Sequence, residues 1–320
     1  MKKIFWGLGL LFILSCSDND KNESSIDYAQ EMRNFVINIH EDAIDKNSEF
    51  IIIPQNGIAL VANNQEATGD LNQPYLEAID GVGQEDLYFG FNLINEQTPV
   101  EETNNLNQFL QKIQAEGKQI LVTDYCFSPE KVSLAYQKNM SQNYIPFVAP
   151  DRELNKIPLQ QLPGENNENV TSLSQVQNFL YLLNTENFNS KADFIQQVQL
   201  TNYDLLITDL FFQAETEFSS AEIEQLKQKA NGGKRLVIAY LSIGEAEDYR
   251  YYWKESWNRD FPDFIEAENP EWEGNFKVKY WEEEWQEIIY GNEEAYLSKI
   301  MNAGFQGVYL DIIDAYEYFE

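Results

Sequence analysis

Apolar runs of strand length alternate with amphipathic stretches along most of the chain. In the amphipathic stretches, apolar residues recur at the spacing of one helix face, as at Met32, Phe35, Val36 and Ile39. Continuous apolar runs separated by such helices are typical of a parallel sheet covered by helices. Seven runs fit buried strands well, and they are 49–57, 75–90, 118–126, 178–184, 204–212, 235–248 and 307–314.

Two further apolar runs, 144–150 and 276–281, are weaker strand candidates. Because seven to nine strands bracket the number in a (β/α)8 barrel, we predict a TIM barrel of the α/β class. An open doubly wound sheet is the alternative. The chain contains neither GxGxxG nor GxxxxGK[ST], so no motif supports nucleotide binding.

One polar segment interrupts the alternation. Residues 151–174 contain two prolines and a glycine and have no clear period, which indicates a linker or a long loop. The strand and helix pattern resumes after it, so residues 27–320 are predicted to form a single barrel domain.

The first residues have the pattern of a bacterial lipoprotein signal. Lys2 and Lys3 precede an apolar run that is too short to span a bilayer, and the small Ser15 stands before Cys16. We therefore expect a signal peptide at 1–16, lipidation at Cys16 and a flexible acidic tether at 17–26. An ordinary cleaved signal is the alternative. The expected location is the cell envelope, at the outer membrane and surface-exposed, with the lipid as the only membrane contact.

The charge limits the choice of partners. The chain has 22 basic and 53 acidic residues, a formal net charge of -31, which argues against nucleic acid and anionic membrane. It suits a cationic ligand, although a solvated acidic face explains it equally well. His40 is the only histidine, and Cys126 is the only cysteine besides Cys16, so neither a disulfide nor a zinc site is expected. We expect a monomer with no cofactor and no metal.

Acidic and amide residues follow most of the predicted strands. In a (β/α)8 barrel the active site lies at these strand ends. Carboxylates gathered there repel one another, which a fold tolerates mainly where function needs it, although helix capping or solvent exposure is the other explanation. The strand-end residues are Asn184, Asp209, Glu245, Asp311, Gln55, Asn56, Glu85 and Asp124.

Carboxylates without a histidine, cysteine or metal motif suit glycoside hydrolysis. One acid protonates the leaving oxygen, and the other attacks the sugar or stabilises the oxocarbenium-like transition state. A Mg²⁺-dependent hydrolase is an alternative use of such a cluster, since hard cations prefer oxygen ligands.

Five segments carry a resemblance to a known family, namely 51–57, 78–90, 240–253, 268–289 and 304–319. Together they resemble glycoside hydrolase family 114, in its endo-α-1,4-polygalactosaminidase-like branch. The resemblance implies a barrel that cleaves a galactosamine-rich polysaccharide. Such a polymer is cationic when partly deacetylated, which would give the net charge of the chain a role in attracting substrate.

The order of these segments departs from the family. There, the helix and strand that resemble 27–57 directly follow the strand that resembles 307–314, whereas here they stand at the front. The chain therefore resembles a circular permutant in which residues 151–174 join the usual ends. Barrels tolerate this when the original termini are close, so Asp27 and Phe319 are predicted to be neighbours.

The resemblance also implies roles for individual residues. Asp311 matches the family's nucleophile or stabilising carboxylate, Glu85 matches the general acid, and Glu245 is the other acid candidate. Apart from the resemblance, Arg250 is expected to pair with a nearby acid, and the aromatic residues Tyr251, Tyr252, Trp253 and Trp257 either line subsites or pack against helices. A glycan-binding lipoprotein without turnover is the alternative function. The predicted substrate-binding residues are Asp209, Asp124, Gln55, Asn56, Tyr240 and Tyr316.

Overall fold

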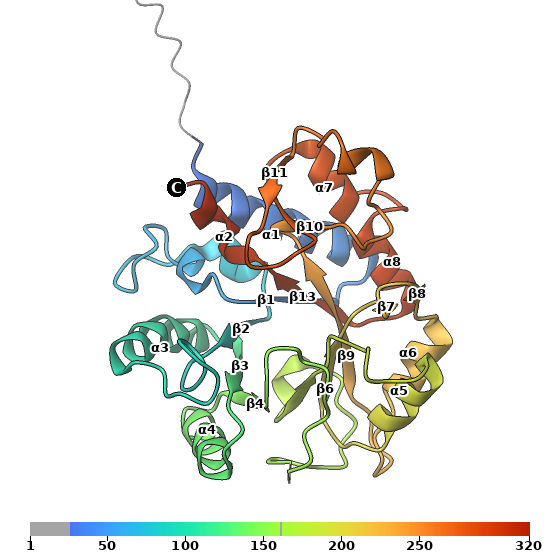
Figure 1. Ribbon diagram of the computed structural model, residues 1–320. Coiled ribbons are helices and arrows are strands. Elements are labelled where there is room, and N and C mark those ends of the chain that lie inside the picture. Colours follow the sequence, from blue (N-terminus) through green and yellow to red (C-terminus); the bar gives the residue numbers. More distant parts are fainter. Residues whose placement is uncertain (1–25, 161) are drawn as a thin grey trace, which may run out of the picture.

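The computed structural model describes residues 26–160 and 162–320, so the predicted signal, Cys16 and nearly all of the tether lie outside the described residues. Its parallel strands surround the middle of the molecule, and helices lie outside them (Figure 1). Within the described ranges, no helix is both long and apolar enough to cross a membrane. The parallel strands are β1 (Ile51–Pro54), β2 (Gly81–Glu85), β3 (Gln119–Tyr125), β4 (Ile145–Ala149), β5 (Phe179–Tyr181), β6 (Leu205–Thr208), β9 (Leu236–Ser242) and β13 (Gly307–Asp311).

These strands form two parallel sheets, in the orders β1-β13-β9-β6-β5 and β2-β3-β4. A single parallel bridge between Gln55 and Gly83 connects β1 to β2. On the opposite side the contact between β4 and β5 is made by side chains, with the rings of Phe147 and Phe179 5.5 Å apart. The strands therefore follow the ring order of a (β/α)8 barrel. The α/β class with parallel sheets is confirmed, but no continuous ladder of hydrogen bonds closes a barrel in the described part of the chain.

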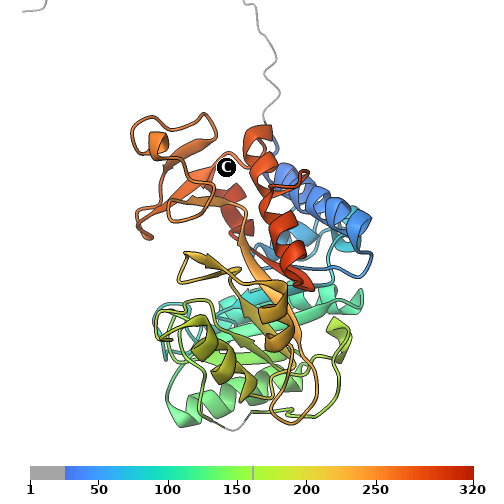
Figure 2. The ribbon, with the colours of Figure 1, turned by 90° about the vertical axis from the view of Figure 1, so that its right-hand side faces the viewer.

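The two weaker strand candidates have different outcomes. The run 144–150 provides β4, whereas 276–281 contributes to β12 (Asn275–Val278), which pairs antiparallel with β10 (Glu245–Glu247) and β11 (Ile265–Glu268). The alternation of apolar and lysine residues in this run is typical of a strand with one wet face. In Figure 2 the orange segment that carries this sheet projects at the upper left, away from the blue N-terminal helix.

The predicted apolar face of the first helix is confirmed. Met32, Phe35, Val36 and Ile39 are all fully buried. The helices are α1 (Tyr28–Lys46), α2 (Gln73–Glu77), α3 (Val100–Ala115), α4 (Pro129–Ser141), α5 (Lys191–Gln199), α6 (Ser220–Leu226), α7 (Glu283–Ile289) and α8 (Tyr296–Ala303). Shorter elements are the 3₁₀ turns η1 (Ile58–Val61), η2 (Leu173–Gln175), η3 (Glu255–Asn258) and η4 (Ile313–Tyr318), and the hairpin of β7 (Phe211–Phe212) and β8 (Thr216–Glu217).

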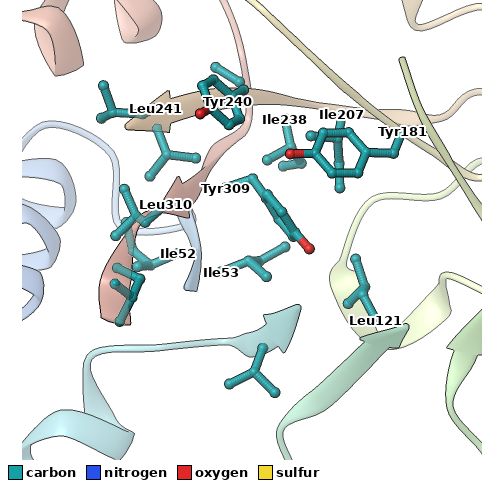
Figure 3. Close-up of a cluster of buried hydrophobic side chains, with 14 of the residues drawn as sticks. Ile52, Ile53, Leu121, Tyr181, Ile207, Ile238, Tyr240, Leu241, Tyr309 and Leu310 are labelled. Carbon is teal, nitrogen blue, oxygen red and sulfur yellow. The ribbon is translucent and has the colours of Figure 1, made fainter. Parts of the chain in front are cut away.

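Side-chain alternation along each strand decides which residues face the interior of the ring. Tyr309 on β13 pairs in register with Ile53 on β1 and Tyr240 on β9, so these three residues share the inward face. In Figure 3 Tyr309 lies between Ile53 and Tyr181, and its ring centroid is 5.3 Å from that of Tyr181. Gly83 on β2 leaves room for Tyr309, because a Cβ there would lie 1.9 Å from its hydroxyl. The interior is a packed core below the strand ends.

The two ends of the described chain meet. The ring of Phe319 lies 5.5 Å from the ring of Tyr28, the first residue of α1 and the neighbour of Asp27. The hydroxyl of Tyr280 donates a 2.8 Å hydrogen bond to the carbonyl of Tyr28. Figure 1 places the C-terminus beside the start of α1. The predicted proximity of Asp27 and Phe319 is therefore confirmed.

Candidate active site

A cleft of about 750 Å³ opens at the C-terminal ends of the parallel strands. Its lining includes nine acidic side chains and two arginines, Arg152 and Arg250. Both arginines are held in ion pairs with carboxylates, so the uncompensated charge of the cleft is negative. The acidic residues are Glu85, Glu186, Asp209, Glu245, Glu247, Glu271, Glu273, Asp311 and Asp314.

Asp311 is the last residue of β13 and shares its inward face with Tyr309. Its Oδ2 accepts a 2.8 Å hydrogen bond from the hydroxyl of Tyr240 on β9. Burial raises the pKa of Asp311 to about 7, and the nearby charge of Glu85 adds to the shift. The cleft therefore holds a carboxyl group that changes its charge near neutral pH.

Glu85 ends β2 on the same inward face, two residues after Gly83. Its Oε2 accepts a 3.1 Å hydrogen bond from the Asn56 amide, and its Oε1 accepts one from the Tyr125 hydroxyl. The Glu85 backbone N–H also donates to the Asn56 Oδ1 at 3.1 Å. Two neighbouring elements therefore fix the orientation of this carboxylate towards the cleft.

Arg152 lies in the segment that was predicted to be a linker, and it contacts Tyr125, the residue whose hydroxyl donates to Glu85. Its guanidinium carbon lies 4.3 Å from the centroid of the Tyr125 ring. Its Nη2 donates to Asp86 Oδ2 at 2.7 Å and to the Gly90 carbonyl at 3.1 Å. Burial raises the pKa of Asp86 to about 6 although Arg152 opposes the shift. Arg152 thus connects residues 151–174 to the turn that directly follows Glu85.

Arg250 forms ion pairs with two buried acids, Asp209 and Glu247. It donates from Nη1 to Asp209 Oδ2 at 2.6 Å and from Nε to Glu247 Oε2. Asp209, at the end of β6, also accepts a 2.7 Å bond from the backbone N–H of Phe211, and burial raises its pKa. The prediction that Arg250 pairs with a nearby acid is confirmed. Asp209 lines the cleft, but the ion pair occupies one of its oxygens.

Glu245 lies at the start of β10 with its side chain fully buried against the cleft wall. It accepts hydrogen bonds from Asn269 at 2.8 Å, from Tyr318 at 3.2 Å and from Asn275 at 3.3 Å. Burial raises its pKa, although these donors oppose the shift. Both of its oxygens are therefore committed to contacts within the protein.

Two of the predicted substrate-binding residues do not line the cleft. Asp124 points away from it, because strand alternation turns Asp124 outward and Tyr125 inward. Its carboxylate accepts bonds from the backbone N–H groups of Tyr88 and Phe89 and from the Asn139 side chain on α4. Asp124 is therefore a buried link between a loop and a helix.

The second correction concerns the tyrosines of η4. Tyr316 is buried in the core, and it is Tyr318, two residues later, that lines the cleft. Gln55, Asn56 and Tyr240 do line it. The cleft is also lined by residues that were not predicted from the sequence, including Tyr181, Tyr249, Trp272, Asn269, Asn275 and Asp314. Trp272 belongs to a segment that carried the family resemblance, which was the available signal for it.

The four aromatic residues with two possible roles pack against the protein. Tyr251 stacks on Phe211 with centroids 5.7 Å apart, and Trp253 lies 5.2 Å from Trp257. The ring of Tyr252 meets Trp285 at 5.7 Å. None of the four lines the cleft. In residues 26–160 and 162–320, no group of three His, Cys, Asp or Glu side chains is arranged to hold a metal ion.

Parallel strands in ring order and a carboxylate-lined cleft at their C-terminal ends define a barrel-type α/β protein with its site at the strand ends. The model of glycoside-hydrolase family GH114 matches residues 160–320. The chain belongs to this family.

Similar proteins occur in distant organisms. An uncharacterised protein of Methanocaldococcus jannaschii is 43% identical over 159 residues, which are 48% of this chain and 42% of that protein. Proteins of Thermotoga maritima and Deinococcus radiodurans are 46% identical over 95 residues and 38% identical over 123 residues. The matches cover 30% and 38% of this chain and 28% and 37% of those proteins. The chain therefore spans less than half the length of these relatives.

Proposed function

We propose that the protein is a glycoside hydrolase that cuts within a galactosamine-rich, cationic polysaccharide. The observation that carries this proposal is the pair of strand-end carboxylates, Asp311 and Glu85, at the floor of one acidic cleft. Family membership supports the class of reaction. The excess of acids over arginines in the cleft supports a cationic substrate, since a neutral polymer would gain nothing from it.

The two carboxyl groups divide the work in this proposal. Glu85, held by Tyr125 and Asn56, donates a proton to the glycosidic oxygen as the bond to the anomeric carbon breaks. Asp311, oriented by Tyr240, attacks that carbon or stabilises the oxocarbenium-like transition state, and water then completes the hydrolysis. Burial and the charge of Glu85 raise the pKa of Asp311, and an ammonium group on the bound sugar would lower it and thereby favour the ionised form.

The test measures new reducing ends from partly deacetylated α-1,4-galactosaminogalactan. The wild type should release them, and Asp311→Asn and Glu85→Gln should each lower the rate by at least about 10³-fold. Asp260→Asn, an exposed residue outside the cleft lining, is the matched control and should keep full activity.

Other outcomes of this test separate the alternatives. Polymer retained but never cut by the wild type would favour the glycan-binding protein without turnover. Activity that disappears with a chelator and returns with Mg²⁺ would favour the metal-dependent hydrolase. Neither cutting nor retention would refute the proposed substrate.

We also propose that the protein is an outer-membrane lipoprotein anchored through Cys16 and exposed at the cell surface. The support is the sequence pattern before Cys16 and the acidic tether after it. A long polymer cannot enter the cell, so a surface position would bring the cleft to its substrate.

A further inference from the structure

Trp272 differs from the other tryptophans in the described part of the chain. It is 56% exposed and lines the cleft, at the tip of the turn between β11 and β12. Trp257 and Trp285 are buried, and Trp253 and Trp281 pack against the core. An indole ring left open beside a cleft has a large apolar face available to a ligand.

The turn that carries Trp272 is rigidly held. The backbone N–H of Asn269 donates to the Asn275 carbonyl at 2.7 Å, and that of Asn275 donates to the Trp272 carbonyl at 3.1 Å. Gly274 has a φ of +83° and lies against Asp248, where a Cβ would come within 2.8 Å of the carboxylate. The ring is therefore presented on a preorganised turn, which lowers the entropy lost on binding.

Glu245 connects this turn to the rest of the cleft wall. Asn269 and Asn275, the two ends of the turn, both donate to its carboxylate, and so does Tyr318 on η4. Lys277 on β12 sits 3.9 Å from the centroid of the Tyr318 ring and adds a second contact between η4 and the projecting sheet. A carboxylate that accepts bonds from both ends of a turn is placed to fix that turn.

Two more carboxylates belong to the residues next to Trp272 in the sequence. Glu271 and Glu273 are exposed and line the same cleft. The hexosamine ring has an apolar face that stacks on an aromatic ring, and its ammonium group is attracted both by the indole face and by nearby carboxylates. An exposed aromatic face with two cleft-lining acids next to it in the chain matches an amino sugar better than a neutral one.

We propose that Trp272 is a stacking platform for one hexosamine ring of the polymer, with Glu271 and Glu273 receiving its ammonium group, and that Glu245 is the positioning residue of this platform and not the general acid. This proposal rests on the proposed function, because it names a further subsite of the same cleft. In this proposal Glu245 takes no part in proton transfer, and the projecting sheet contributes to substrate binding.

The binding test uses Asp311→Asn protein, so that no substrate is consumed. An α-1,4-linked galactosamine octamer is titrated by calorimetry and by tryptophan fluorescence. Adding Trp272→Ala should weaken binding by about 10- to 100-fold and remove the fluorescence change, whereas Trp272→Phe should retain most of the affinity. Phe127→Ala, which removes an exposed ring outside the cleft lining, is the control and should bind normally.

The results separate a failure of the Trp272 platform from a failure of the proposed function. Equal binding with and without the Trp272 ring would overturn the platform alone. No binding by the parent Asp311→Asn protein, together with no cutting by the wild type, would overturn both. Equal affinity for the fully N-acetylated octamer would overturn the role of Glu271 and Glu273.

Glu245 is tested by kinetics. Glu245→Gln and Asn269→Ala should both raise KM for the polymer about 10-fold, keep kcat within about 3-fold and leave the pH profile of kcat unchanged. Asn269→Ala removes one anchoring bond without removing the buried carboxylate, so it covers the case in which Glu245→Gln unfolds. A fall of kcat by several orders of magnitude in folded Glu245→Gln, with loss of one limb of the pH profile, would make Glu245 the acid and overturn the assignment.

Discussion

At the scale of single residues, strand alternation decides which carboxylates reach the cleft. Asp311 and Glu85 lie on inward-facing positions of β13 and β2, in phase with Tyr309 and Gly83. Asp124 is out of phase by one residue and bonds to a loop and to α4. A position at the end of a strand does not by itself show whether an acid faces the cleft. The two-residue period of side chains along the strand does show it.

The raised pKa of Asp311 has a consequence for stability. An acid whose folded-state pKa is about 7, against about 3.9 in the unfolded chain, stabilises the protein fully below pH 4, and this contribution is lost as the pH rises through 7. Asp311→Asn should therefore unfold with a shallower pH dependence between pH 4 and 8, and at pH 8 it should be more stable than the wild type by roughly 4 kcal/mol. Urea unfolding across this range measures the effect. Parallel curves for the two proteins would contradict it.

Asp124 stabilises the fold through the hydrogen bonds that its carboxylate accepts. Its replacement by Ala leaves the N–H groups of Tyr88 and Phe89 and the amide of Asn139 without their acceptor. We expect a loss of about 3 kcal/mol in the free energy of unfolding, while Asp124→Asn, which keeps one acceptor oxygen, should lose less. Thermal and urea unfolding measure both. An unfolding curve of Asp124→Ala that overlays the wild type would show that these bonds do not stabilise the fold.

At the scale of elements, Arg250 ties the projecting segment to the parallel sheet. It bridges Asp209 at the end of β6 and Glu247 in β10, and all three side chains are nearly inaccessible to solvent. The antiparallel sheet of β10, β12 and β11 is thereby fixed over one side of the cleft. The sequence indicated an acid partner for Arg250 but did not show that one cation serves two acids.

Arg250→Met should be strongly destabilising, because it leaves two buried carboxylates unpaired. We expect a loss of about 3 to 5 kcal/mol at pH 7, and a smaller loss near pH 4, where protonation removes the unpaired charges. Arg250→Lys keeps the charge but not the fork that reaches both acids, so it should recover only part of the stability. Urea midpoints at the two pH values test this. A loss that does not depend on pH would mean that packing, and not charge, is what Arg250 contributes.

At the scale of the whole molecule, we propose that the chain is a circular permutant of its family. The ring order of the strands, the contact between Tyr28 and Phe319 and the restriction of the family match to residues 160–320 support this proposal. Leu159, in the predicted linker, is fully exposed and lies outside every helix and strand, so opening the chain there breaks no regular pairing.

A reordered chain tests the permutation. Residues 27–159 are moved behind Glu320 through a short Gly/Ser linker, so that the new chain begins after Leu159. We expect the same circular dichroism spectrum, a melting temperature within about 5 °C of the original and unchanged glycan binding. A chain opened within β9 is the control and should not fold, because it divides a central strand. Failure of both reordered chains to fold would contradict the proposal.

The sequence by itself determined the α/β class, the apolar strands and the acids that follow them, because burial and side-chain period are local properties that a linear pattern records. It also indicated the meeting of Tyr28 and Phe319 through the order of the family-like segments. Tertiary structure alone decided which groups act on one another. Arg152 reaches Tyr125 from a loop without a period, Trp272 enters the cleft on a projecting turn, and burial together with Glu85 raises the pKa of Asp311. Those effects depend on distances between residues far apart in the chain, and electrostatic and packing energies follow distance in space and not separation in sequence.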